Sequence, residues 1–282
     1  MNPGRGYRFL LPAILVCYAC ARVLQVITGP TPWLSLVALD VVSAAAFALV
    51  AGARDYGWRG ILVFAGICLA AGNVVENIGI ATGFPFGHYR FLEVMGPRIL
   101  SVPILLGLAY VGMAYVSWSL ARTLLGTTRR EDGLRVLALP AVASVIMVSW
   151  DFAQDPVWST FLHAWVWRDG GSWFGVPLSN YAGWFGTVFT IYLLFAMYLR
   201  RRPGADMGVA QPMWPAVAFY ALCAAGNVLQ VWVPQPIAVL PDPSGRQWRV
   251  AEILRASALV SIFLMGTFVL LAAGRLRART RD

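Results

Sequence analysis

Long apolar runs separated by short polar segments follow one another along the whole chain. A membrane core about 30 Å thick needs about 20 apolar residues per helix, which is close to the length of most of these runs. The pattern predicts eight transmembrane helices, at about residues 9–27, 33–51, 61–81, 99–121, 136–150, 181–199, 215–233 and 251–273. We therefore expect an all-α fold, a polytopic membrane helix bundle that forms one integral membrane domain over residues 1–282.

Composition supports a membrane protein and sets its expected orientation. Of the 282 residues, 59% are hydrophobic and 12% are charged, whereas about 25% of the residues in a soluble domain are charged. All 22 basic residues are arginine, and with eight helices fifteen of them lie on the side of the two termini and six on the other side. Since arginine is enriched in cytoplasmic loops, we expect a plasma-membrane protein with both termini in the cytoplasm. The net charge of +9 then reflects orientation, and we expect no nucleic-acid partner.

A short motif occurs twice. The sequence Ala-Ala-Gly-Asn-Val at residues 70–74 recurs at residues 224–228, in the third and seventh predicted helices. The repeat is consistent with two four-helix halves, at roughly residues 1–125 and 134–275. Small residues are also common wherever membrane helices pack closely, so both explanations stay open.

Several polar residues fall inside the predicted helices, where they are costly and usually face the bundle interior. Arg22 and Asp40 lie at similar depths on neighbouring helices, which favours a structural ion pair. Asn73, Glu76 and Asn77 share one helix face because they are three and four residues apart. They serve either as hydrogen-bonding contacts between helices or as a polar site in which the two amides hold Glu76.

The segment between the fifth and sixth predicted helices is rich in acids and tryptophan. Asp155 precedes Pro156, which is typical of a helix N-cap followed by proline at the first helical position. An apolar stripe of Trp158, Leu162 and Trp165 follows, so we expect an interfacial helix on the outer side. Most acids and tryptophans also fall on that side, while Asp55 on the cytoplasmic side is expected to be a solvated charge.

Two stretches together carry a resemblance to a known family. Asn-Val-Val-Glu-Asn-Ile-Gly at residues 73–79 continues into Gly-Phe-Pro-Phe-Gly-His-Tyr at residues 83–89. The second stretch comprises Asp151 to Pro156, Trp-Val-Trp at residues 165–167 and the segment 171–184. Over about residues 70 to 185 the chain resembles a family of membrane carotenoid-biosynthesis proteins that includes carotenoid 1,2-hydratases of the bisanhydrobacterioruberin hydratase type.

The resemblance implies a hydro-lyase that adds water to the terminal 1,2 double bond of an acyclic or monocyclic carotenoid. Such a reaction needs a carboxylic acid that remains protonated, aromatic faces that stabilise a tertiary cation, and one positioned water molecule. We expect Asp151 to donate the proton, Glu76 to be its partner or to hold the water, and Asp155 to be the third carboxyl group. The expected substrate-binding residues are Asn73, Asn77, Phe86, Tyr89, Trp150, Trp165, Trp173, Asn180 and Tyr181.

The implied reaction moves only water and protons, so we expect no cofactor. We also expect no metal site, because the chain has two histidines and its four cysteines lie in apolar runs without zinc-ligand spacing. The partners are then the bilayer and a carotenoid or another long isoprenoid lipid. Two other functions stay open. Asp151 and Asp155 have the DxxxD spacing of a magnesium-dependent intramembrane prenyltransferase, and a non-catalytic carotenoid or lipid carrier could use the same residues.

Overall fold

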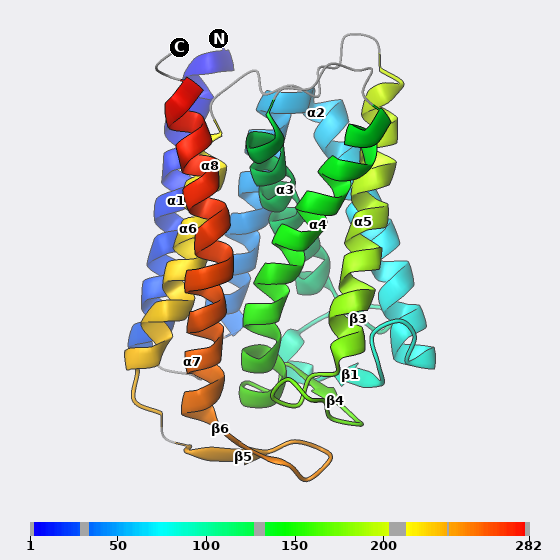
Figure 1. Ribbon diagram of the computed structural model, residues 1–282, viewed down its shortest axis with the longest axis vertical. Helices are drawn as coiled ribbons and strands as arrows, with labels where there is room; N and C mark the ends of the chain where they lie inside the picture. The colour runs from blue at the N-terminus through cyan, green and yellow to red at the C-terminus, as the bar shows by residue number, and fades with distance from the viewer. Residues whose placement is uncertain (1–2, 29–33, 127–132, 203–212, 236, 280–282) are drawn as a thin grey trace.

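Long helices packed side by side form the molecule in the computed structural model (Figure 1), which describes residues 3–28, 34–126, 133–202, 213–235 and 237–279. The all-α bundle expected from the sequence is confirmed. Within the described residues, seven helices are long and apolar enough to cross a membrane, α7 and α8 forming one span through a π-helical turn at Ser261–Met265. The helices are α1 (Pro3–Thr28), α2 (Leu34–Thr82), α3 (Ile104–Leu125), α4 (Gly133–Pro156), α5 (Leu178–Arg200), α6 (Trp214–Leu229), α7 (Val250–Val260) and α8 (Gly266–Arg279).

Helix α2 contains both the second and the third predicted runs. It has 49 residues, and its backbone leaves the helical region at Gly57, where φ is 69°. Only glycine adopts this left-handed conformation without strain. Figure 1 shows α2 as two legs that descend from a bend. The seven helices therefore cover all eight predicted runs, except that residues 99–103 of the fourth run precede α3. Trp33 at the start of the second run, and Arg129, Arg130 and Arg281 in the arginine count, lie outside the described residues.

Short strands gather at the end of the bundle opposite the start of α1 and the end of α8 (Figure 1). They form three two-stranded antiparallel pairs, each joining segments near the ends of long helices. The pairs are β1 (Tyr89–Phe91) with β4 (Trp165–Trp167), β2 (Arg98–Ile99) with β3 (Val102–Pro103), and β5 (Val239–Pro241) with β6 (Gln247–Arg249). Single turns lie at η1 (Glu93–Met95), η2 (Val157–Phe161) and η3 (Gln230–Trp232). We call this the strand end of the bundle.

The expected interfacial helix beginning at Asp155 is wrong. Helix α4 continues through Pro156 and ends in the π-helical turn η2, after which residues 165–167 form strand β4. Proline lacks an N–H group, so the carbonyl of Phe152 loses its usual partner four residues later. The indole N–H of Trp173 donates to that carbonyl at 3.3 Å instead. This tertiary contact lets the helix pass through a sequence that is typical of a helix start.

Among the described residues, one buried polar cluster lies toward the strand end, where Gln154 also donates to Asn227 at 3.0 Å, and another lies beside the bend of α2 at the opposite end. The Arg22 guanidinium lies 3.2 Å from the Asp40 carboxylate and also donates to the Asn227 amide at 2.7 Å, which links α1, α2 and α6. The side chain of Asp55, expected to be solvated, is in fact only 5% exposed. It lies 3.2 Å from the Arg122 guanidinium and accepts a hydrogen bond from Tyr115 at 2.9 Å. Burial of paired charges inside the bundle agrees with their high cost in hydrocarbon.

Candidate functional site

The β1–β4 ladder brings four aromatic side chains to one side. Tyr89 pairs with Trp167 and Phe91 with Trp165 across the two strands. Side chains alternate between the two faces of a strand, so the patterns Tyr-Arg-Phe and Trp-Val-Trp place all four rings on the same face. The ring centres of Tyr89 and Trp167 are 4.9 Å apart, and those of Phe91 and Trp165 are 6.0 Å apart. The ladder therefore builds one aromatic wall of a cavity at the strand end.

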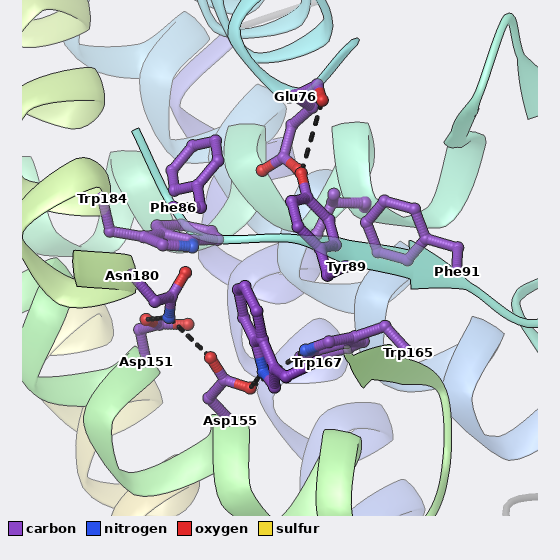
Figure 2. Close-up of a pocket in the computed structure, with 11 residues that line it drawn as sticks. Glu76, Phe86, Tyr89, Phe91, Asp151, Asp155, Trp165, Trp167, Asn180 and Trp184 are labelled. Carbon is purple, nitrogen blue, oxygen red and sulfur yellow. Dashed lines mark hydrogen bonds between the residues drawn. The ribbon is translucent and has the colours of Figure 1, made fainter. Parts of the chain in front are cut away.

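Helix α4 presents two carboxyl groups to this cavity. Asp151 and Asp155 are four residues apart, so they lie one above the other on the same helix face. The buried amide of Asn180, at the start of α5, bridges them by donating to Asp155 Oδ2 at 2.6 Å and to Asp151 Oδ2 at 3.2 Å. The two acids and the amide are 5%, 1% and 1% exposed in the order Asp151, Asp155 and Asn180. Figure 2 shows the three side chains turned toward one another.

The two aspartates differ in their hydrogen bonding. Asp155 Oδ1 accepts from the indole N–H groups of Trp165 at 2.9 Å and Trp167 at 3.2 Å, and its Oδ2 accepts from Asn180. Both oxygens of Asp155 are thus occupied by donors. Within the described part of the chain, the recorded donor to Asp151 is the Asn180 amide alone. Asp151 therefore has an oxygen that is free to carry a proton or to contact a bound molecule.

Glu76, near the end of α2, is the third buried carboxyl group. Its Oε1 accepts from the Tyr110 hydroxyl at 2.8 Å, and its Oε2 accepts a short hydrogen bond from Tyr89. Burial raises the pKa of Tyr89, and the neighbouring Glu76 carboxyl group raises it further, so the phenol stays a neutral donor. The amides expected to hold Glu76 have other contacts, since Asn77 donates to Asn73 Oδ1 at 3.0 Å and accepts from the Ser101 N–H at 3.1 Å.

Two glycines explain how an aromatic ring fits between α2 and α5. A Cβ atom at Gly79 would lie 2.7 Å from the Phe86 ring, and one at Gly183 would lie 2.8 Å from its other side. Any larger residue at either position would push the ring away. Phe86 is thereby held at the cavity beside Trp184, whose own ring stacks on Tyr110 with centres 4.6 Å apart. The two stretches that resemble the family, residues 73–79 and 171–184, thus each contribute a glycine that leaves room for the same ring.

The cavity lined by these groups has a volume of about 30 Å³. This is room for a water molecule but not for the end of an isoprenoid chain. All three carboxyl groups line the cavity. Figure 2 shows the aromatic rings between Glu76 on one side and the two aspartates on the other. The lining residues are Glu76, Phe86, Tyr89, Phe91, Leu106, Asp151, Asp155, Trp165, Trp167, Asn180 and Trp184.

The other expected substrate-binding residues lie outside this lining. Trp173 stacks on Phe152 with ring centres 4.5 Å apart, and Tyr181 packs edge-on against Phe152 at 4.8 Å. The Tyr181 hydroxyl is buried, with no hydrogen-bond partner among the described residues. Trp150 is partly buried and packs against the core. Asn73 and Asn77 are bound to each other, and none of these five residues belongs to the cavity lining.

Sequence reasoning missed several lining residues. Trp167 and Phe91 could have been found, because the alternation in Trp-Val-Trp and Tyr-Arg-Phe is a strand signal. Leu106 and Trp184 line the cavity and Tyr110 binds Glu76 behind it. All three lie in long apolar helices, where nothing local distinguishes a cavity residue from a core residue. One indirect signal is Gly72, whose absent side chain leaves room for the Tyr110 ring at 3.4 Å.

Comparison with known proteins is consistent with this site. Bisanhydrobacterioruberin hydratase from Haloarcula japonica is 30% identical to the chain over 122 residues, which are 43% of this chain and 40% of the relative. The chain thus matches less than half of that relative's length. No solved structure gives a significant match. A family model described as "Carotenoid biosynthesis protein" matches residues 34–241, which include every residue of the cavity lining. The chain therefore belongs to the carotenoid biosynthesis protein family, as its two motif stretches indicate.

Proposed function

We propose that this protein is a carotenoid hydratase, which adds water to the terminal 1,2 double bond of an acyclic or monocyclic carotenoid without a cofactor. One observation carries the proposal: three buried carboxyl groups line a water-sized cavity that is walled by aromatic rings. The membership in a carotenoid biosynthesis family and the hydratase among its relatives support the same reaction.

The chemistry follows from these groups. Asp151 donates a proton, and the π electrons of the alkene form the new C–H bond, which leaves a tertiary cation on the adjacent carbon. In this proposal the end of the carotenoid reaches these groups when side chains of the wall move aside, since the cavity as it stands has room for water alone. The faces of Tyr89, Trp165 and Trp167 then stabilise the cation through their ring electrons. A water molecule in the cavity forms the C–O bond, and its released proton returns to a carboxylate. Each turnover consumes one water and regenerates the acid, so atoms and charge balance.

Hydrogen bonding favours Asp151 over Asp155 as the proton donor. A neutral carboxylic acid has one O–H donor, which needs an oxygen that is not already facing another donor. Asp155 meets donors at both oxygens, whereas Asp151 meets one donor at one oxygen. In this proposal Asp155 positions the pair with Asn180, and Glu76 holds the water. The unpartnered hydroxyl of Tyr181 supplies a further polar contact beside the cavity.

The hydrogen-bond contacts of the site favour hydration over prenyl transfer. A magnesium-bound diphosphate needs several free carboxylate oxygens, but Asp155 is occupied by two indoles and an amide. A carrier would use the cavity without turnover, so it predicts that Asp151→Asn leaves function intact, whereas a hydratase loses its proton source.

Expression in a lycopene-producing host tests the proposal. Mass analysis of the extracted pigments is expected to show the gain of one or two water molecules, with the Asp151→Asn variant as the inactive control. An unchanged pigment profile, with protein shown to be inserted in the membrane, would refute hydration of that substrate. In the host, we place the protein in the plasma membrane with both termini in the cytoplasm, on the arginine distribution, and with the strand end at the outer leaflet.

A further inference from the structure

A second, larger pocket lies directly behind the aromatic wall. It has a volume of about 220 Å³, and Trp167 lines both this pocket and the acid cavity. The larger pocket also includes the polar residues Ser159, Thr160, His163 and Asp242, together with Val166. His163 is exposed, so the pocket reaches the protein surface at the strand end.

One helical turn connects the larger pocket to Asp155. Ser159, which lines it, donates to the backbone carbonyl of Asp155 at 2.7 Å. The Trp167 ring is the part of the wall that the two cavities share, and its indole N–H is anchored on Asp155 Oδ1 at 3.2 Å. Trp165 makes a similar bond to the same oxygen, but it lines the acid cavity alone.

We propose that the larger pocket is the route by which water reaches the Asp151–Asp155 pair, and that Trp167 is its gate. The function of this route rests on the proposed hydration, which consumes one water per turnover at a site with room for little more than one. The lining can hold water, because two hydroxyl groups, an imidazole and a carboxylate lie among its apolar residues. Side-chain rotation of Trp167 away from Asp155 joins the two cavities.

Cysteine accessibility tests the route without relying on turnover. In purified protein in lipid nanodiscs, the exposed Cys17 and Cys20 are replaced by serine, while the buried Cys68 and Cys223 give the unlabelled baseline. Leu106→Cys then places a thiol in the acid cavity. We expect a charged, water-soluble thiol reagent to label it slowly, and Trp167→Ala to raise the labelling rate on the order of tenfold, because access controls thiol reactivity.

Matched variants separate a gate from a general loosening of the wall. Trp165→Ala removes a neighbouring indole from the same strand and the same Asp155 oxygen, and we expect it to leave the labelling rate of Leu106→Cys nearly unchanged. Val166→Trp fills the larger pocket, and in the Trp167→Ala protein it is expected to restore protection. If Trp167→Ala does not fold, Trp167→Phe keeps the ring, frees it from Asp155 and is expected to raise labelling by a smaller factor.

The outcomes decide the inference independently of the reaction. Equal labelling in the Trp165 and Trp167 variants, no increase in either Trp167 variant, or labelling that Val166→Trp does not slow would each overturn the route. A protein that shows the expected labelling but never hydrates a pigment keeps the water route and loses the proposed function instead.

Discussion

Replacing each aspartate of the pair by asparagine should give two different defects. In Asp151→Asn, the new carbonyl oxygen can keep the single hydrogen bond from Asn180, and the new NH₂ group can face water in the cavity that Asp151 lines. We therefore expect a change in unfolding free energy of less than about 1 kcal/mol. In Asp155→Asn, the new NH₂ group must face either Asn180 or the indoles of Trp165 and Trp167. The orientation with the smaller loss leaves one buried donor unpaired, which costs about 1–3 kcal/mol.

For activity, in contrast to stability, we expect a large loss in Asp151→Asn. A general acid contributes on the order of 10²–10⁴ in rate, so Asp151→Asn should lose nearly all hydration while its melting temperature stays close to that of the unaltered protein. Asp155→Asn should melt several degrees lower, in line with about 2–4 °C per kcal/mol. Thermal melting of purified protein and mass analysis of pigments measure the two effects. A folded Asp151→Asn protein that keeps a substantial part of the activity would show that the proton comes from elsewhere.

Three further predictions concern stability. A Cβ atom at Gly226 would lie 2.3 Å from the Arg22 guanidinium, whereas one at Gly66 meets nothing within 4 Å. Thermal melting should therefore show Gly226→Ala destabilised by about 1–3 kcal/mol. The matched variant Gly66→Ala should be unchanged or more stable. Partial burial raises the pKa of Asp242, but hydrogen bonds from the Ser244 hydroxyl, the Trp248 indole and nearby backbone N–H groups outweigh it and leave the pKa below its ordinary value. The β5–β6 hairpin should therefore lose stability as pH falls below about 4, and limited proteolysis should show this pH dependence vanish in Asp242→Asn. Because the pKa of Tyr89 is raised in the folded protein, unfolded protein releases the phenolic proton first, so melting temperatures should fall above about pH 10 and fall less in Tyr89→Phe.

Local patterns predicted some features of the site and misassigned others. The sequence marks Glu76 because an acid inside an apolar helix is costly, and it marks Asp151 and Asp155 because they lie in a tryptophan-rich stretch that resembles the family. The fold places all three at one cavity. Asp155 was also read as a possible helix cap, since Pro156 follows it. That interpretation was wrong because the indole of Trp173, distant in the sequence, satisfies the carbonyl that Pro156 leaves free.

The sequence by itself determined the class of fold, the length and number of the apolar runs, and the family. These follow from hydrophobicity and from short motifs, which act within a few residues of the chain. The tertiary structure decided which groups hold each acid. Tyr89 and Tyr110 replace the expected amides at Glu76, and Asn180 joins the two aspartates. These hydrogen-bond partners lie on different helices and strands. Because the packing of the bundle decides which of them come into contact, no local sequence pattern predicts them.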